Sequence, residues 1–351
     1  MSLYTNEAYV DDIKRVAKTD LPWEKFANKS VLISGATGML GSFLIDVLME
    51  KNAAGLNCTV YALGRTREKA EERFKKWRDD AHLVYIAYDI NQPFSRDDLG
   101  QINFVLHLAS NTHPMQYATD PIGTIKTNII GLQNMLDFAI DHYAQRFVFA
   151  SSNEIYGENR GDTELFDERY CGYIDPNTLR AGYPESKRCG EALCQAYKSQ
   201  RDLDVVISRF TRSYGPTMQM SDTKAISQFI KKGVAGENIV LKSSGTQNYS
   251  YTYVVDAVYG LFTIILKGEN GEAYNIADET SNITLKELAQ IIADFTGKRV
   301  VFEIPEAMEA KGYSKATKAL LDGSKLKKLG WSPFYSIQEG IIRTISILKN
   351  M

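Results

Sequence analysis

Apolar runs of strand length alternate with helix-like patterns through roughly the first two hundred residues of this chain. Segments such as 30–35 (SVLISG) are almost continuously apolar, which is typical of strands buried on both faces. Segments such as 39–52 (MLGSFLIDVLMEKN) instead repeat apolar residues at three- and four-residue steps, as helices do. The alternation predicts an α/β fold, namely a Rossmann-type, doubly wound parallel sheet with helices on both faces. The expected strands are 30–35, 58–64, 83–89, 102–110, 146–152 and 204–210.

The pattern changes at both ends of this region. After about Thr211 the elements become shorter and turns such as SSGTQ appear, which predicts a smaller C-terminal α+β substrate lobe. We therefore expect a dinucleotide-binding domain at 29–211, which also receives about 250–275, and a mainly substrate-binding lobe at 212–351. Residues 1–28 predict a helical extension docked on the sheet domain, with partner binding as the alternative. Its N-cap is Asn6 and its apolar stripe is Tyr9, Val10, Ile13, Val16 and Ala17.

A glycine-rich segment, SGATGMLG, follows the first expected strand and opens the first long helix. Glycines at Gly35, Gly38 and Gly41 let the backbone approach a pyrophosphate, and the helix N-terminus supplies N–H donors and a positive dipole. Three glycines alone are weak evidence, but a strand before them and a helix after them is the required context. The segment predicts a dinucleotide site. The other expected cofactor contacts here and in LHLAS are Thr37, Met39, Leu40, Leu108, Ala109 and Ser110.

The second strand ends in Gly64 and Arg65, where an acid would be expected to hold the ribose of NAD. An arginine suits a 2′-phosphate, so Arg65 favours NADP, although it could instead stack on the adenine of NAD. Asp89 and Ile90, after the third strand, are candidates to flank the adenine; a plain strand-end aspartate is the alternative. The cofactor is therefore NAD or NADP.

Tyr183 and Lys187, in GYPESKR, are four residues apart on one face of an expected helix at 180–200. The pair is a weak signal alone, but its position after the fifth strand gives it weight. A lysine ammonium and a cationic nicotinamide both favour tyrosinate, so we expect the pKa of Tyr183 to be lowered towards neutrality. Tyrosinate can accept a hydroxyl proton while hydride leaves the same carbon for the cofactor. Both residues are therefore predicted to be catalytic and to contact the cofactor.

The motifs SGATGMLG, LHLAS, SSNEIYG, YPESK and SYGP together resemble the extended short-chain dehydrogenase/reductase family, which comprises sugar-nucleotide epimerases, dehydratases and decarboxylases. The resemblance runs over nearly the whole chain after about residue 29. Segments 107–131 and 180–197 are most similar to those of UDP-glucuronate decarboxylases. The resemblance implies an enzyme that transiently oxidises C4 of a nucleotide-linked sugar. It also implies a homodimer formed through the two long helices that follow the fourth and fifth strands.

The segment FASSNEIYG carries the residues that separate the reactions of this family. By resemblance, Ser152 hydrogen-bonds the reacting sugar hydroxyl, and Glu154 matches a glutamate of the decarboxylases and 4,6-dehydratases. The dehydratases carry an aspartic acid beside this glutamate to expel the C6 hydroxyl, whereas this chain has Asn153. An amide cannot donate a proton as an acid does, so decarboxylation is favoured over dehydration. A strand-end surface carboxylate is the alternative for Glu154. Asn111 and Asn153 are expected substrate contacts.

Two positions depart from the family pattern. The family has Asn at Arg212 and Arg at Tyr249, so one cation has moved to another segment. Arg212 could still clamp a phosphate, with Lys315 or Lys318 assisting; alternatively, the substrate is not a glycosyl diphosphate of the usual shape. We expect Arg212 and Tyr249 to line the substrate site.

Composition limits the partners. The chain is 44% hydrophobic and 24% charged with net charge −2, so nucleic-acid binding by charge is not expected. Apolar runs are shorter than a membrane span and no signal segment is recognisable, so we expect no membrane partner. The four cysteines lack CxxC spacing and the four histidines lack HExxH spacing, which predicts no metal site and a cytoplasmic protein with reduced thiols.

Three readings remain besides a decarboxylase. A reductase of a nucleotide-linked keto sugar would fit Arg65 and the altered phosphate residues. A 4-epimerase is disfavoured by the bulk and charge of Glu154. A non-catalytic binding module is disfavoured because Ser152, Tyr183 and Lys187 are all present. Net consumption of NADPH separates the reductase from the decarboxylase, which is redox-neutral.

Overall fold

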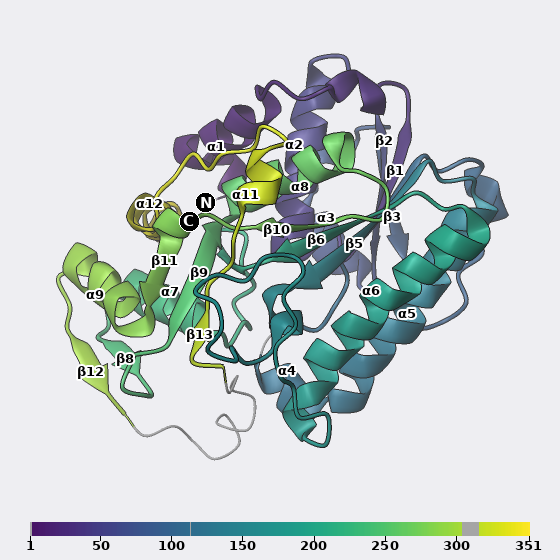
Figure 1. The fold of residues 1–351 in the computed structure, drawn as a ribbon. Coiled ribbons are helices and arrows are strands. Elements are labelled where there is room, and N and C mark those ends of the chain that lie inside the picture. The colour runs from purple at the N-terminus through teal and green to yellow at the C-terminus, as the bar shows by residue number, and fades with distance from the viewer. Residues whose placement is uncertain (1, 113, 304–315) are drawn as a thin grey trace.

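The computed structural model describes residues 2–112, 114–303 and 316–351. Within them, seven strands form one parallel sheet, which confirms the predicted doubly wound α/β fold (Figure 1). In spatial order the strands are β3 (Leu83–Ala87), β2 (Thr59–Gly64), β1 (Ser30–Ser34), β4 (Phe104–His107), β5 (Arg146–Ser152), β6 (Val205–Phe210) and β10 (Ala273–Ile276).

Helices cover both faces of this sheet because alternate strand residues point to opposite sides. On β1, Val31 and Ile33 join the core on one face, and Leu32 joins the core on the other. The first face is covered by α2 (Met39–Ala53), α3 (Arg67–Arg73) and α8 (Val254–Lys267). The second is covered by α5 (Pro121–Asp141) and α6 (Gly182–Arg201), which run side by side (Figure 1).

The expected elements match closely, with one difference in α3. The charged segment TREKAEERFKKWRDD (66–80) has the pattern of a single helix, but α3 ends at Arg73 and a short 3-10 turn follows at Lys75–Trp77. The backbone N–H of Phe74 caps the helix by bonding the Ala70 carbonyl, and Phe74 is buried against the sheet. The burial of this aromatic ring, rather than helix propensity, sets where the helix ends.

The C-terminal residues build smaller layers over the carboxyl ends of the parallel strands. A four-stranded sheet combines β7 (Arg212–Tyr214), β9 (Asn248–Tyr253), β11 (Asn282–Thr284) and β13 (Lys318–Ala319). A parallel pair consists of β8 (Ile239–Leu241) and β12 (Val300–Phe302). The accompanying helices are α7 (Ala225–Ala235), α9 (Leu285–Thr296) and α12 (Ile337–Lys349), whereas α11 (Ser324–Lys327) contacts β10 and α8.

The N-terminal helix α1 (Glu7–Ala17) begins at the expected cap, because the Asn6 side chain accepts from the backbone N–H of Tyr9 at 3.3 Å. Its buried side packs on α2, α8 and α12. That side also carries a buried carboxylate, Asp12, which accepts hydrogen bonds from Tyr253, Tyr335 and Arg343. The extension therefore contacts both a helix of the sheet domain and the last helix of the chain.

No helix in the described part of the chain combines the length and the apolar character that a membrane span requires. All four cysteines are free, with Cys58 and Cys194 buried and Cys171 and Cys189 exposed. The same residues contain no group of three or more His, Cys, Asp or Glu side chains that could hold a metal ion.

Candidate active site

A cavity of about 620 Å³ lies at the carboxyl ends of the parallel strands, where doubly wound folds bind their ligands. Its walls come from the segments after β1, β2, β4, β5 and β6 and from the C-terminal layers. Setting aside Lys315 and Lys318, every residue that the sequence assigned to catalysis, cofactor or substrate lines this one cavity. They are Gly35, Thr37, Gly38, Met39, Leu40, Gly41, Arg65, Asp89, Ile90, Leu108, Ala109, Ser110, Asn111, Ser152, Asn153, Glu154, Tyr183, Lys187, Arg212 and Tyr249.

The glycine-rich turn has the shape that a dinucleotide requires. Gly35 has φ +73°, and a Cβ there would come within 2.8 Å of the Ala109 backbone nitrogen. A Cβ on Gly41 would lie 2.5 Å from the Gly35 carbonyl oxygen. Gly38 precedes the first turn of α2, and no side chain caps that helix. The open N–H groups of α2 face a backbone cradle that only glycine permits, so the residues present fit a pyrophosphate.

The end of the cavity near β2 lacks the carboxylate that NAD enzymes use at this position. Arg65 is exposed at its edge, and Lys69, one turn along on α3, lines the same wall. Asp89 is exposed and its side chain accepts from the Asn91 backbone N–H at 3.0 Å, whereas Ile90 is buried. Lys69 was not predicted, although its spacing from Arg65 on a charged helix is visible in the sequence.

Tyr183 and Lys187 lie on the first turns of α6, both almost fully buried. The Lys187 ammonium donates to the Ala150 carbonyl oxygen at 2.8 Å, and burial lowers its pKa to about 7. Burial, and then the charge of Glu154, raise the pKa of Tyr183 to about 12, against the lowering by its hydrogen bond to Ser152. The expected lowering of the Tyr183 pKa towards neutrality invoked a bound cationic nicotinamide as well as Lys187. In the protein alone, desolvation outweighs the lowering by Ser152, Arg180 and Tyr117.

Glu154 is not a plain surface carboxylate. It lies in the short 3-10 turn Asn153–Tyr156 directly after β5 and forms an ion pair with Arg180, whose side chain is 12% exposed. The Arg180 guanidinium lies 4.7 Å from the centre of the Tyr117 ring, and that ring stacks on Tyr183 at 4.6 Å. Arg180 and Tyr117 were not predicted. Arg180, three residues before Tyr183, had the sequence signal of proximity to the helix start.

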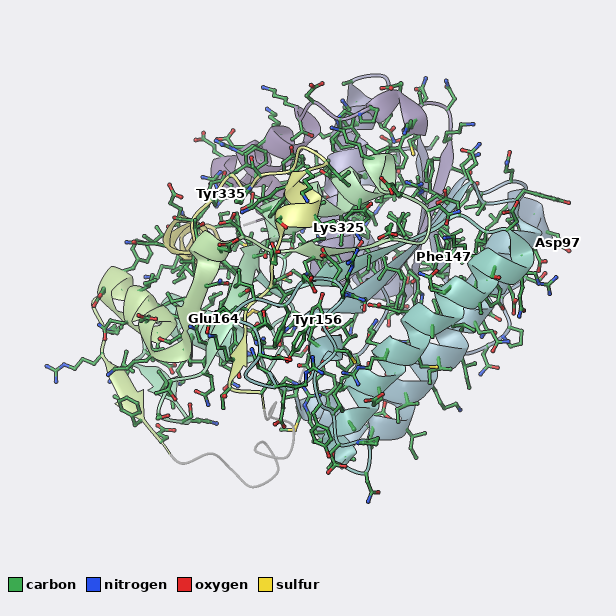
Figure 2. The ribbon with its side chains drawn as sticks, in the orientation of Figure 1. Asp97, Phe147, Tyr156, Glu164, Lys325 and Tyr335 are labelled. Carbon is green, nitrogen blue, oxygen red and sulfur yellow. The ribbon has the colours of Figure 1, made fainter. Side chains whose placement is uncertain are left out.

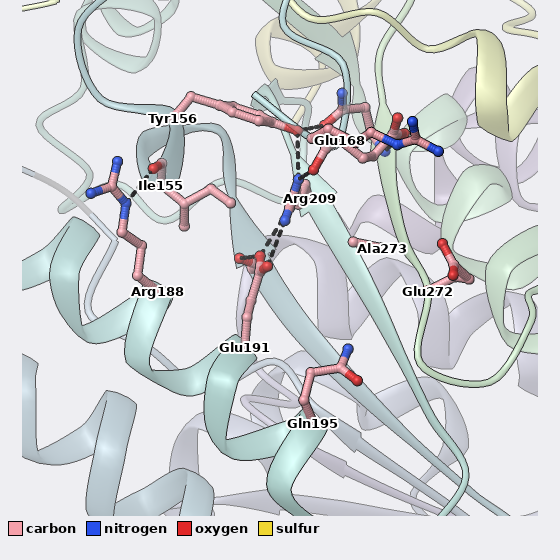
Figure 3. A network of polar contacts seen from close by, with 12 residues as sticks. Ile155, Tyr156, Glu168, Arg188, Glu191, Gln195, Arg209, Glu272 and Ala273 are labelled. Atoms are coloured by element: carbon pink, nitrogen blue, oxygen red, sulfur yellow. Dashed lines mark hydrogen bonds and ion pairs between the residues drawn. The ribbon is translucent and has the colours of Figure 1, made fainter. Parts of the chain in front are cut away.

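A network of polar contacts fixes α6 against the turn that carries Glu154 (Figure 3). Arg188, one residue after Lys187, donates to the Ile155 carbonyl oxygen at 2.7 Å. Further along α6, Glu191 accepts from Arg209 of β6 at 2.6 Å and from Ser151 of β5 at 2.5 Å. These bonds set the distance between Tyr183 on the helix and the Ser152–Glu154 segment at the end of the strand.

Arg212 and Tyr249, the two departures from the family pattern, lie against each other. The Arg212 guanidinium carbon is 3.4 Å from the centre of the Tyr249 ring. β7 and β9 are neighbouring parallel strands, which brings the two side chains together. The Nη1 atom of Arg212 is buried and has no hydrogen-bond partner among the described residues. The cation thus stacks on the aromatic ring and keeps N–H donors at the cavity wall.

The remaining predicted contacts are of two kinds. The Asn111 side chain donates to the Thr124 hydroxyl at 3.1 Å. Asn153 is buried, and its Oδ1 atom accepts from the Ser152 hydroxyl at 3.5 Å. Lys318 does not line the cavity: it forms an ion pair with Glu164, which Figure 2 labels near β13. The idea that Lys318 assists phosphate binding is therefore wrong, because a surface carboxylate engages its charge. Lys315 lies outside the described residues.

This cavity, with its glycine cradle at one end and Ser152, Tyr183 and Lys187 at the other, is that of a nucleotide-cofactor enzyme. The chain belongs to the NAD dependent epimerase/dehydratase family, because the sequence model of that family matches residues 31–277.

Among its relatives, the chain is most informatively compared with UDP-glucuronic acid decarboxylases. It is 31% identical to UDP-glucuronic acid decarboxylase 3 of Arabidopsis thaliana over 315 residues, covering 90% of this chain and 87% of that protein. It is 30% identical to UDP-glucuronic acid decarboxylase 1 of Xenopus tropicalis over 344 residues, covering 97% of this chain and 78% of that protein.

Solved structures share the fold. A dTDP-glucose 4,6-dehydratase from Streptomyces venezuelae, with NAD and TYD bound, superimposes with a TM-score of 0.78 at 23% identity, covering 92% of this chain and 97% of the other. UDP-glucuronic acid 4-epimerase from Bacillus cereus, in complex with UDP-glucuronic acid and NAD, gives a TM-score of 0.78 at 22% identity, covering 92% and 99%. At these identities the likeness concerns the fold.

Proposed function

We propose that this protein is a UDP-glucuronate decarboxylase that uses a bound nicotinamide cofactor and is redox-neutral overall. The single observation that carries the proposal is the position of Glu154, which lines the same cavity as Tyr183 while its neighbour is the amide Asn153. An acid to expel a C6 hydroxyl is missing at that neighbouring position, and decarboxylation needs none. The decarboxylases named above support the choice, since two of them align over nine-tenths or more of the chain.

The residues of the cavity would share the reaction as follows. When bound, the oxidised nicotinamide would take a hydride from C4 of the sugar and later return it. Tyr183 would accept the proton of the C4 hydroxyl, with Ser152 hydrogen-bonding the same oxygen. The 4-ketone lies β to the C6 carboxylate, so the C5–C6 bond breaks, CO2 leaves and its electron pair forms an enolate. A proton from solvent added at C5, the hydride returned to C4 and the proton returned by Tyr183 to the C4 oxygen would complete a pentose.

Arg212 is our candidate for the substrate's anionic groups. Its guanidinium is stacked on Tyr249 and has a buried N–H group without a partner among the described residues. A planar guanidinium can bind a phosphate or carboxylate through two parallel hydrogen bonds. We assign residues 212–351 mainly to the substrate on this basis. Asn111 and Asn153, on the same cavity wall, are the further candidates for substrate contacts.

Incubation of the purified protein with UDP-glucuronate tests the proposed reaction. We expect release of CO2 and formation of a UDP-pentose in equal amounts, with no net change in reduced cofactor. Mass spectrometry of the nucleotide product and absorbance of the cofactor measure both quantities. No turnover at high protein concentration would remove this function.

We propose NADP as the cofactor because Arg65 and Lys69 line the adenosine end of the cavity and no acid follows β2. A charge-assisted hydrogen bond contributes about 1.5–3 kcal/mol, so Arg65→Ser should weaken NADP binding by about tenfold or more. Binding of NAD should change little. Dissociation constants of both cofactors, for the protein and the variant, test this, and tighter NAD binding by the unchanged protein contradicts it.

A reductase of a nucleotide-linked keto sugar is the second candidate, favoured by the same two cations, since net reductases commonly draw on NADPH. It differs in stoichiometry: each product formed would oxidise one NADPH. The cofactor absorbance in the UDP-glucuronate assay, repeated with a 4-keto sugar nucleotide, separates the two functions.

We also propose a cytoplasmic homodimer. Four free thiols support a reducing compartment. On α5, Leu132, Met135 and Leu136 are buried in the chain's own core, whereas Ile122 is 72% exposed and Ile125 is 37% exposed. Such residues would suit the surface of a second copy. Light scattering at micromolar concentration would measure the assembly.

A further inference from the structure

Four side chains from four separate segments form one continuous cluster beside the proposed catalytic tyrosine. They are Tyr117 of α4 (Pro114–Thr119), Glu154 of the turn after β5, Arg180 of the 3-10 turn Leu179–Ala181, and Tyr183 of α6. All line the cavity. The ion pair Glu154–Arg180 is joined to Tyr183 through the Tyr117 ring, which lies against both Arg180 and Tyr183.

The charges in this cluster oppose one another at Tyr183. The carboxylate of Glu154 disfavours the tyrosinate form of Tyr183, whereas the guanidinium of Arg180 favours it. Tyr117 and Ser152 also lower the pKa of Tyr183 through side-chain hydrogen bonds, and Asp222 faces Tyr117. Lys187, on the same helix as Tyr183, is engaged by the Ala150 carbonyl oxygen. Arg180 is therefore the guanidinium that faces both the carboxylate and the tyrosine.

We propose that Arg180 is a positioning residue of the reaction: by pairing with Glu154 it fixes that carboxylate and offsets its charge, so that Tyr183 can ionise beside it. This deepens the proposed function and rests on it for the step that Tyr183 carries out. The arrangement solves a conflict within the site. The carboxylate of Glu154 is placed where its charge would suppress the ionisation of Tyr183, and a cation from the turn before α6 offsets that charge.

The cluster also explains why the cation is an arginine stacked on a tyrosine. An arginine can bond a carboxylate while its flat face lies on an aromatic ring, which a lysine ammonium cannot do with the same geometry. Tyr117 thus holds the guanidinium and packs against the ring of Tyr183 at the same time. A change at Arg180 should therefore be felt at Tyr183, although Arg180 need not touch the substrate.

The test measures ionisation of Tyr183 directly and needs no turnover. Protein labelled with a carbon isotope at the tyrosine Cζ is saturated with whichever oxidised cofactor binds more tightly. The Tyr183 signal is assigned by its loss in Tyr183→Phe and followed against pH. We expect the midpoint to rise by about one pH unit or more in Arg180→Met and to fall by a similar amount in Glu154→Gln, because each removes one of two opposed charges. The double variant should lie between the two single variants.

Arg201→Met is the matched control, since it removes the same kind of charge from the exposed far end of α6, about 30 Å from Arg180 by helix length. Its midpoint should equal that of the unchanged protein. Equal midpoints in Arg180→Met and the unchanged protein would overturn the proposal. If Arg180→Met does not fold, the Glu154→Gln variant becomes the test. A Tyr183 titration midpoint that does not fall in Glu154→Gln would overturn the proposal as well.

Turnover of UDP-glucuronate and the Tyr183 titration midpoints are separate measurements, so failure of this proposal can be distinguished from failure of the proposed function. If the protein turns over UDP-glucuronate, the acid limb of its kcat profile should move to higher pH in Arg180→Met. Activity at pH 7 should then fall by about tenfold for every pH unit by which that limb moves. A protein inactive on UDP-glucuronate that still shows the expected order of midpoints loses the proposed function and keeps this proposal. An active protein with equal midpoints keeps the function and loses the proposal.

Discussion

Replacing Tyr183 by phenylalanine should lower the turnover of UDP-glucuronate by about a thousandfold, within the range that general acid–base groups contribute. The substitution removes only the hydroxyl that would accept and return the C4 proton. The ring that stacks on Tyr117 at 4.6 Å stays, so the cavity wall should keep its shape. Release of CO2 under saturating substrate measures the effect, and the loss should lie in kcat rather than in KM.

Tyr197→Phe is the matched control for this prediction. It removes a hydroxyl from the same helix, where Tyr197 donates to Asp137 at 2.5 Å, and Tyr197 does not line the cavity. Its activity should stay within a factor of a few of the unchanged protein. A Tyr183→Phe protein that retains more than about a tenth of the activity would show that the phenol is not the acid–base group.

The sheet could be predicted from the sequence because its strands are buried on both faces. Such strands read as unbroken apolar runs, and 146–152 coincides with β5. Helix ends were harder, as α3 shows: its end is set by the burial of Phe74, a tertiary contact that periodicity does not contain. The assembly of β7, β9, β11 and β13 into one sheet was also not foreseen, since β11 and β13 have only three and two residues.

Site residues could be predicted where a sequence motif has a fixed spacing that the chemistry requires. Gly35, Tyr183 and Lys187 were found this way, and all three line the cavity. Arg180 and Tyr117 were not found, because Arg180 had only its proximity to the start of α6 as a signal and nothing local distinguishes Tyr117 from another helix aromatic. Their importance comes from contacts across 63 and 66 residues of chain and becomes visible only once α4 and the start of α6 are seen together. The raised pKa of Tyr183 in the protein alone was not predicted for the same reason, since its burial is a property of the fold.

One buried charge of the fold, Asp46, has a signal in the sequence. Asp46 interrupts the apolar stretch FLIDVLM of α2, and a charge in a fully buried helix needs partners. Those partners come from the N-terminal extension and from the segment after β2. Tyr4 and Tyr9 donate to Asp46 at 2.7 and 2.6 Å, and Arg73 pairs with it at 2.5 Å. The extension is therefore tied to the helix whose first turn forms the glycine cradle.

Replacing Asp46 by alanine should lower the free energy of unfolding by about 3–5 kcal/mol, because it leaves the largely buried Arg73 and the buried hydroxyl of Tyr9 without their acceptor, whereas the Tyr4 hydroxyl keeps the Arg73 carbonyl oxygen. Arg73, whose side chain is only 16% exposed, cannot recover its hydration without opening the fold. Urea unfolding followed by circular dichroism gives the magnitude. Limited proteolysis should in addition release the first residues of the variant sooner, since the anchor of Tyr4 and Tyr9 is lost.

Two further variants separate the charge from its surroundings. Asp46→Asn keeps the shape and one acceptor oxygen but loses the charge opposite Arg73, so its loss of stability should be smaller than that of Asp46→Ala. Glu50→Ala removes the same charge from a half-buried position one turn further along α2 and should change stability by no more than about 0.5 kcal/mol. Equal losses in Asp46→Ala and Glu50→Ala would mean that the pairs seen around Asp46 contribute nothing beyond helix propensity. Asp46 would then not be what holds the extension against the cofactor-binding helix.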